Sequence, residues 1–254
     1  MKTIIYKFFK FLGFRLISNS VDSHRQREIN NLKQENEKIR FLMSDNISRK
    51  TELFNYIDSS KSQICQDWFV LESLNYKKNG YFVEIGAFDG VLGSNCIHFE
   101  KSMKWDGIAI EPSKKQFEKL SKNRNCKVLN EAISSTEKDV EFIEVIEGLT
   151  QMSGIDDDNY SAKLIIQSNK KNKFNKNKMK TSTFEKSILT KEIDYLSIDI
   201  EGAELDVLKS INFKEYIIKV ISVENNNPEK INFNLFLKEN NFSFFDRVGQ
   251  DEIF

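Results

Sequence analysis

Residues that form covalent cross-links or metal centres are scarce in this sequence. The three cysteines, Cys65, Cys96 and Cys126, are odd in number, and no two of them have Cys-x-x-Cys spacing. This pattern argues against a disulfide framework or a zinc knuckle and favours a reducing compartment. Because the chain has only two histidines in 254 residues, a histidine-rich metal site is excluded as well.

Long apolar runs and an excess of one charge are also missing. No apolar run reaches the roughly 18 residues that a membrane-spanning helix needs. The 38 basic and 38 acidic residues cancel, so the net charge gives no reason to expect nucleic acid as a partner. The remaining composition, 39% hydrophobic and 30% charged, is typical of a cytoplasmic globular protein with one large domain and appendages.

Two segments precede the region of regular alternation. Residues 1–20 are basic and amphipathic, and a helix there could lie on the anionic inner face of a membrane. A secretory signal and a helix docked on the protein's own core are the rival interpretations. Residues 21–50 are helical in pattern, and the apolar spacing over 24–43, with Asn36 at an a position, is that of a short coiled coil. They predict either a solvated single helix or a stalk that forms a homodimer.

From residue 63 onward, apolar strand-like runs alternate with helix-like segments. This alternation predicts an α/β fold with a Rossmann-like, doubly wound and mostly parallel sheet, in one domain that spans residues 63–254. The expected strands lie near 81–85, 107–111, 127–131, 194–200 and 217–224, and the expected helices near 94–103, 113–122, 202–211 and 229–240.

Three further patterns lie within or after this alternation. Residues 140–145 alternate between polar and apolar, which predicts an added edge strand or a hairpin. The basic, asparagine-rich stretch 166–180 has no periodicity and predicts a flexible exposed loop, which could also bind an anionic acceptor. The runs 242–245 and 251–254 predict a final antiparallel pair.

The most informative stretch is residues 81–95, Tyr-Phe-Val-Glu-Ile-Gly-Ala-Phe-Asp-Gly-Val-Leu-Gly-Ser-Asn. It has the strand, glycine turn and helix with which open α/β sheets hold a nucleotide-like ligand, and Gly86 and Gly90 permit the tight turn. Glu84 and Asp89 add two carboxylates, which would repel a diphosphate and favour a cationic ligand. S-adenosylmethionine, a nucleoside with an ammonium and a sulfonium group, is therefore the first candidate.

Glu84 is the one polar residue inside its apolar strand, and a buried carboxylate without a partner is costly. Backbone amides of the turn or a ligand ammonium could satisfy it. The alternative is a purely internal hydrogen-bonded bracket for the loop.

A second strand end also carries an acid. Glu111 closes the block Trp-Asp-Gly-Ile-Ala-Ile-Glu-Pro at residues 105–112, about 21 residues beyond Gly90. At that separation an acidic side chain meets the ribose hydroxyls of a bound nucleoside, although NAD would fit the same spacing.

A third block delivers a cluster of acids. Residues 194–204 place Asp199 and Glu201 at the carboxyl end of a strand, and the next strand adds Glu224. Such a cluster could orient or deprotonate an acceptor hydroxyl, or collect a divalent cation. Helix capping and surface charge are the alternative interpretation. We take these three acids as candidate catalytic residues and assign no metal ligand from the sequence.

Together the three blocks resemble the FkbM family of class I S-adenosylmethionine-dependent methyltransferases. The matching stretches are 82–90 with Ser94 and Asn95, 107–112 and 195–204, and residues 251–254 also resemble the family's closing pattern. The resemblance covers about residues 63–254. It implies the class I methyltransferase fold and O-methylation of a hydroxyl, commonly on sugars of surface glycans or on secondary metabolites.

The resemblance also implies roles for individual residues. Glu84, Gly86 and Asp89 would cradle the methionine end of S-adenosylmethionine, Glu111 would bind the ribose, and the loop at 130–132 would lie near adenine. The predicted cofactor-binding residues are Glu84, Gly86, Asp89, Gly90, Asn95, Glu111, Asn130 and Ala132.

The sequence therefore predicts an S-adenosylmethionine-dependent O-methyltransferase that acts in line on a small-molecule or glycan acceptor. Two other classes stay open. An NAD-dependent oxidoreductase would share the fold, although the turn lacks Gly-x-Gly-x-x-Gly. The second open class is a non-catalytic, methyltransferase-like binding module that is recruited through its N-terminal helix.

Overall fold

The computed structural model describes residues 56, 60–169 and 171–254. The amphipathic segment predicted for 1–20 and the coiled coil predicted within 21–50 lie outside these residues. Within the described part of the chain, no helix is both long and apolar enough to cross a membrane.

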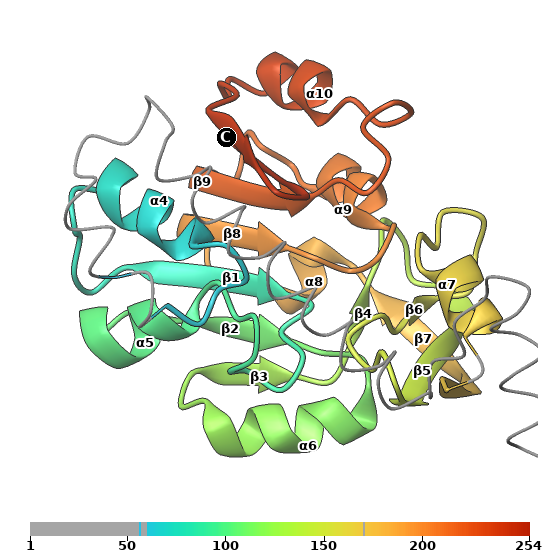
Figure 1. The fold of residues 1–254 in the computed structure, drawn as a ribbon. Coiled ribbons are helices and arrows are strands. Elements are labelled where there is room, and N and C mark those ends of the chain that lie inside the picture. Colours follow the sequence, from blue (N-terminus) through green and yellow to red (C-terminus); the bar gives the residue numbers. More distant parts are fainter. Residues whose placement is uncertain (1–55, 57–59, 170) are drawn as a thin grey trace, which may run out of the picture.

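A seven-stranded sheet forms the centre of the domain, in the order β10-β11-β9-β8-β1-β2-β3 (Figure 1). The five strands from β9 to β3 are parallel, and β11 and β10 extend one edge in antiparallel pairing. This confirms the predicted doubly wound sheet, in which the strand order reverses beside β1. The strands are β1 Tyr81–Ile85, β2 Asp106–Ile110, β3 Lys127–Leu129, β8 Glu192–Ile198, β9 Ile217–Glu224, β10 Asp246–Val248 and β11 Asp251–Ile253.

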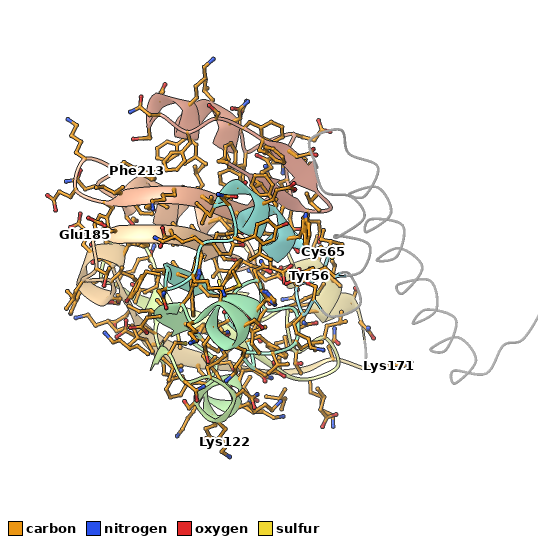
Figure 2. The ribbon with its side chains drawn as sticks, turned by 90° about the vertical axis from the view of Figure 1, so that its left-hand side faces the viewer. Tyr56, Cys65, Lys122, Lys171, Glu185 and Phe213 are labelled. Carbon is orange, nitrogen blue, oxygen red and sulfur yellow. The ribbon has the colours of Figure 1, made fainter. Side chains whose placement is uncertain are left out.

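Helices cover both faces of this sheet because its strands are apolar on both sides. Alternate residues of β1 belong to different core clusters. Val83 and Ile85 pack with residues of α8, α9 and α10, whereas Phe82 packs with residues of α4 and α5. Lysines such as Lys122 stay on the outside (Figure 2). The helices are α4 Gln66–Ser73, α5 Ile97–Met103, α6 Lys114–Asn123, α8 Phe184–Ser187, α9 Glu204–Ser210 and α10 Phe233–Glu239.

A second, four-stranded sheet lies beside the carboxyl ends of the central strands, in the order β4-β7-β5-β6 (Figure 1). Residues 140–145 fall within β5, which lies between β7 and β6 and pairs antiparallel with the next strand in the chain, β6, so the hairpin alternative is correct and the edge-strand alternative is not. The short helix α7, Lys163–Ser168, lies between β6 and β7. The strands are β4 Ala132–Ile133, β5 Asp139–Glu147, β6 Gly154–Ile155 and β7 Lys173–Ser182.

The flexible loop predicted for residues 166–180 is wrong for most of that range, because β7 begins at Lys173. The strand escapes a periodicity search because most of its outer part is exposed on both faces. Its lysines face the acids of β5 instead: Lys173 pairs with Glu147 at 2.9 Å and Lys176 with Glu141 at 3.4 Å. Cross-strand pairs of opposite charge stabilise a strand that hydrophobic patterning does not reveal.

The final antiparallel pair is present, but its first strand differs from the prediction. Residues 251–253 form β11 as expected, and they pair with 246–248 rather than with 242–245. Phe245 contributes one backbone hydrogen bond, to the carbonyl of Ile253 at 2.8 Å.

A buried ion pair satisfies Glu84 on β1. Arg124 donates to Glu84 at 2.8 Å and, through Nε, to Glu100 at 2.6 Å, and the side chains of all three are at most 6% exposed. Ser94 donates a further hydrogen bond to Glu84 at 2.8 Å. The guanidinium also lies over the Phe82 ring, 5.2 Å from its centroid. The internal bracket is therefore the correct alternative for Glu84.

The ends of β1 and β8 meet in a close backbone contact. Gly86 has a φ of +91°, and a Cβ placed on it would lie 1.7 Å from the carbonyl oxygen of Asp199. Only glycine combines this dihedral with this approach. The Asp199 N–H donates to the Ile85 carbonyl at 3.0 Å, and the Gly86 N–H donates to the Ile110 carbonyl of β2 at 3.0 Å. The end of β1 is thereby fixed to both neighbouring strands.

Replacing Arg124 tests the ion pair. We expect Arg124→Met to lower the free energy of unfolding by about 3–5 kcal/mol, because Glu84 and Glu100 would stay buried without a cation. The exposed Lys173–Glu147 pair provides the control, and Lys173→Met should cost less than about 1 kcal/mol. Urea denaturation measures both. If the two substitutions had equal effects, the ion pair would not support the fold as described.

Replacing Gly86 tests the backbone contact. Gly86→Ala should lower the free energy of unfolding by at least about 2 kcal/mol more than Gly93→Ala. Gly93 is a matched control, because its φ is also positive, at +74°, but the nearest atom to an added Cβ is 3.4 Å away. Equal losses in thermal or urea denaturation would show that the dihedral alone, and not the contact with Asp199, requires glycine.

Candidate functional site

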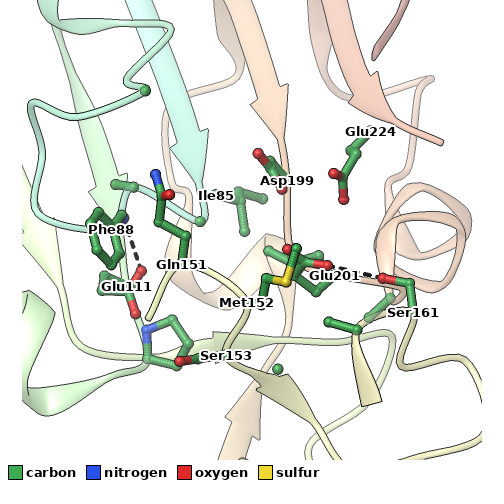
Figure 3. A pocket seen from close by; sticks show the side chains of 18 of the residues that line it. Ile85, Phe88, Glu111, Gln151, Met152, Ser153, Ser161, Asp199, Glu201 and Glu224 are labelled. Carbon is green, nitrogen blue, oxygen red and sulfur yellow. Dashed lines mark hydrogen bonds between the residues drawn. The ribbon is translucent and has the colours of Figure 1, made fainter. Parts of the chain in front are cut away.

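A cavity of about 1130 Å³ opens at the carboxyl ends of β1, β2, β8 and β9 (Figure 3). Its floor is made by residues that directly follow these strands, among them Gly86, Glu111 and Asp199. Residues 149–155, which end in β6, and Ile165 of α7 line it from the second sheet. The cavity therefore lies where the parallel strands end and the strand order reverses, which is the ligand position in this class of sheet.

Glu111 lies at one end of the cavity and is 6% exposed. Its carboxylate accepts a hydrogen bond from the backbone N–H of Phe88 at 2.9 Å and another from Ser113 at 2.8 Å, one on each oxygen. An ionised carboxylate can accept about four hydrogen bonds, so each oxygen keeps room for another donor. Burial raises the pKa of Glu111 to about 8, although the two N–H groups favour the ionised form.

The other end of the cavity carries Glu201, in the turn between β8 and α9. Its φ of +63° is in the left-handed region, which non-glycine residues adopt at a cost of about 1–3 kcal/mol. Glu204 holds the turn by accepting hydrogen bonds from Ile200 at 3.1 Å and Gly202 at 2.9 Å. Ser161 donates to the Glu201 carboxylate at 2.9 Å (Figure 3). These contacts hold Glu201 at the cavity wall.

Asp199 and Glu224 complete a group of three acids at this end. One carboxylate oxygen from each of Asp199, Glu201 and Glu224 lies within 4.8 Å of the others. Burial, followed by the charge of Asp251, raises the pKa of Asp199 well above its usual range. Burial, followed by the charge of Asp199, also raises the pKa of Glu224 well above its usual range. Burial raises the pKa of Glu201 to about 7, against the hydrogen bond from Ser161.

The charge of the cavity is strongly one-sided. Five acids line it, whereas Lys61 is the one basic residue among the lining residues that the structure describes. A cationic ligand would be attracted to this cavity, and a diphosphate would be repelled. Four of the five lining acids, Glu111, Asp199, Glu201 and Glu224, were predicted as site residues, whereas the predicted acids Glu84 and Asp89 are not among them.

Six of the eleven predicted site residues line the cavity, and five do not. The six are Gly86, Glu111, Ala132, Asp199, Glu201 and Glu224. The five that the structure places elsewhere are Glu84, Asp89, Gly90, Asn95 and Asn130.

The carboxylates of Glu84 and Asp89, which were predicted to face a ligand, do not line the cavity and accept hydrogen bonds from groups of the protein. Glu84 is bound to Arg124, as described above. Asp89 accepts hydrogen bonds from the backbone N–H groups of Val91 at 3.0 Å and Leu92 at 2.8 Å, which closes the glycine turn.

Gly90, Asn95 and Asn130 support the site from behind. A Cβ on Gly90 would lie 2.8 Å from the Arg124 side chain, so glycine makes room for the ion pair. Asn95 donates to the hydroxyl of Ser197 on β8 at 3.1 Å. Asn130 donates to the carbonyl of Glu111 at 2.8 Å, and Ala132, two residues later, lines the cavity.

Several cavity residues were missed from the sequence. The longest continuous group is segment 149–155, which has no periodicity that would indicate a wall of a site. Ser161 and Gln250 were also missed, because each is a single polar residue without a motif. Arg124 could have been found: Arg124 and Arg247 are the only arginines after residue 63, where all other basic residues are lysine or histidine, and arginine is favoured for buried ion pairs.

The chain was compared with known families and solved structures. The methyltransferase FkbM domain matches residues 84–245. No curated protein matches the chain. The structure of the methyltransferase FkbM from Methylobacillus flagellatus KT shares 14% identity, with 77% of this chain and 48% of that chain covered and a TM-score of 0.37.

Two further solved structures are similar to a comparable degree. A Pyrococcus horikoshii protein described as an RNA methyltransferase shares 14% identity over 71% of this chain and 66% of that chain, with a TM-score of 0.37. A structure of the fibrillarin/Nop5p complex shares 16% identity over 75% of this chain and 82% of that chain, with a TM-score of 0.34. The chain thus spans about half of the FkbM structure and just under two thirds of the Pyrococcus protein.

The family match agrees with the resemblance predicted from the three sequence blocks. It includes Glu111 and the three clustered acids, and it covers well over half of the 254 residues. The chain therefore belongs to the FkbM methyltransferase family.

Proposed function

We propose that this protein transfers a methyl group from S-adenosylmethionine to a hydroxyl group of a sugar, a surface glycan or a secondary metabolite. The observation that carries the proposal is the composition of one continuous cavity, with Glu111 at one end and three clustered acids at the other. The first end suits a nucleoside, and the second suits a hydroxyl group next to a cationic donor.

The donor end fits S-adenosylmethionine in three respects. Glu111 has room on each oxygen for a further donor, which matches the two hydroxyls of a ribose. Ala132 and Ile133 provide an apolar wall next to it, where an adenine ring would pack. The acidic lining would attract the ammonium and sulfonium groups. When bound, S-adenosylmethionine supplies a methyl group that is already activated for transfer.

The acceptor end suits a polyhydroxylated molecule. Ser161, Asn226 and Gln250 line it together with the acids, so both hydrogen-bond donors and acceptors are present there. Asp199 accepts the hydrogen bond of the acceptor hydroxyl and takes its proton as the C–O bond forms and the S–CH₃ bond breaks. Glu201 and Glu224 assist in orienting it. The products are the methyl ether and S-adenosylhomocysteine.

Donor binding should depend on pH through Glu111. Ribose hydroxyls donate to the ionised carboxylate, so the proton held with a pKa of about 8 must leave when the ligand binds. The affinity for S-adenosylhomocysteine should therefore rise on the order of 20-fold from pH 6.5 to pH 8.5. In Glu111→Gln, affinity at pH 8.5 should fall at least about tenfold, and this part of the pH dependence should disappear.

Titration calorimetry at several pH values measures this effect, with NAD as the competing ligand. The charge of Glu144 on β5 also contributes to the raised pKa of Glu111, so Glu144→Gln serves as the control and should keep most of the pH dependence. Tighter binding of NAD than of S-adenosylhomocysteine would favour the oxidoreductase alternative and refute the donor assignment.

Turnover tests the acceptor end. With isotope-labelled S-adenosylmethionine and a panel of glycans and small hydroxylated metabolites, Asp199→Asn should lower kcat by about 10²–10⁴-fold. Its affinity for S-adenosylhomocysteine should change only a few-fold. The matched control, Asp139→Asn, removes an exposed acid of β5 and should keep full activity. Full turnover by Asp199→Asn would exclude Asp199 from the reaction, and donor binding without transfer to any acceptor would favour a non-catalytic binding module.

A further inference from the structure

The three clustered acids come together because two parallel strands end side by side. Asp199 directly follows β8, Glu201 follows two residues later, and Glu224 is the last residue of the neighbouring strand β9. Their side chains lie at the same end of the cavity (Figure 3), with one carboxylate oxygen of each within 4.8 Å of the others. Three negative charges within 4.8 Å repel strongly when ionised, so the arrangement requires a compensating positive charge or protons.

The described part of the chain supplies no such positive charge. Within the described residues, none of the three acids forms an ion pair with a lysine or arginine. The basic residue of the cavity lining, Lys61, is on an exposed position outside the strand ends. Glu84 differs in this respect, because it lies on the neighbouring strand β1 and forms an ion pair with Arg124.

A second, independent observation points to a missing ligand. Glu224 is only 9% exposed, and its Oε2 has no hydrogen-bond partner. A buried acceptor without a partner costs about 1–3 kcal/mol, so proteins rarely leave one unsatisfied. Glu224 lines the same end of the cavity as Glu201 and Asp199 (Figure 3), and one oxygen of each acid lies within 4.8 Å of the others, so a ligand bound there would lie close to all three.

We propose that Asp199, Glu201 and Glu224 bind one hard divalent cation, of the Mg²⁺, Mn²⁺ or Ca²⁺ class. Carboxylate oxygens are the ligands that these ions prefer. Three oxygens within 4.8 Å of one another lie at most about 2.8 Å from a common centre. Ca²⁺–oxygen distances are about 2.3–2.6 Å and Mg²⁺–oxygen distances about 2.0–2.1 Å, so a small side-chain rotation would bring all three oxygens to coordination distance.

In the proposed reaction the cation would activate and position the acceptor hydroxyl, and this catalytic role rests on the proposed function. All three ligands line the cavity, so the remaining coordination positions face the acceptor. A hydroxyl that coordinates the cation loses its proton more easily, and its oxygen is held in a fixed position. Cation binding itself does not depend on the identity of the donor or the acceptor.

The experiment titrates Mn²⁺ into the full chain and follows the free ion by electron paramagnetic resonance. We expect one Mn²⁺ per chain with a submillimolar Kd, displaced by Mg²⁺ or Ca²⁺. Glu224→Gln and, separately, Glu201→Gln should each weaken binding at least tenfold. Glu147→Gln, which removes an exposed acid of β5, should leave it unchanged. Two acid variants are used so that a folding defect in one does not decide the result.

The outcomes separate this proposal from the proposed function. Absence of Mn²⁺ binding at millimolar concentration, or wild-type affinity in both variants with equal melting temperatures, overturns the cation site. In that case the acids are satisfied by protons. Because S-adenosylhomocysteine binding is measured on the same samples, donor binding without Mn²⁺ binding rejects the cation alone. Mn²⁺ binding without donor binding rejects the proposed function and leaves the cation site standing.

Discussion

The close backbone contact between Gly86 and Asp199 determines where the site can form. It fixes the end of β1 against the end of β8, at the point where the strand order reverses. Glu111 directly follows β2 on one side, and Glu224 is the last residue of β9 on the other, so the same edge of the sheet carries both ends of the cavity. The fold therefore explains why Glu111 and the three clustered acids share one cavity.

Two kinds of buried acid occur next to each other in this sheet, and they differ in what neutralises them. Glu84 is paired with Arg124 inside the protein, and the pair supports the glycine turn from behind. The clustered acids at the ends of β8 and β9 lack such a partner among the described residues and face the cavity. A buried carboxylate that the protein leaves uncompensated is the one available to a cationic ligand, whether a sulfonium donor or a metal ion.

Much of the main sheet could be predicted from the sequence, because apolar runs and their spacing determine strands that are buried on both faces. The roles of Glu111 and Asp199 as cavity residues were also predictable, since both end such strands. Periodicity could not reveal β7, which depends on charge pairs with β5, or the cavity wall at 149–155. The direction of the Glu84 side chain depends on Arg124, 40 residues away in sequence, and no local pattern contains that information.

A crystal structure of the protein with S-adenosylhomocysteine tests the central claim most directly, namely that one cavity holds the donor at Glu111 and the acceptor at the clustered acids. We expect both ribose hydroxyls within hydrogen-bond distance of the Glu111 carboxylate and the sulfur directed toward Asp199. A nucleoside bound with its ribose away from Glu111, or with its sulfur directed away from the acids, would contradict this arrangement.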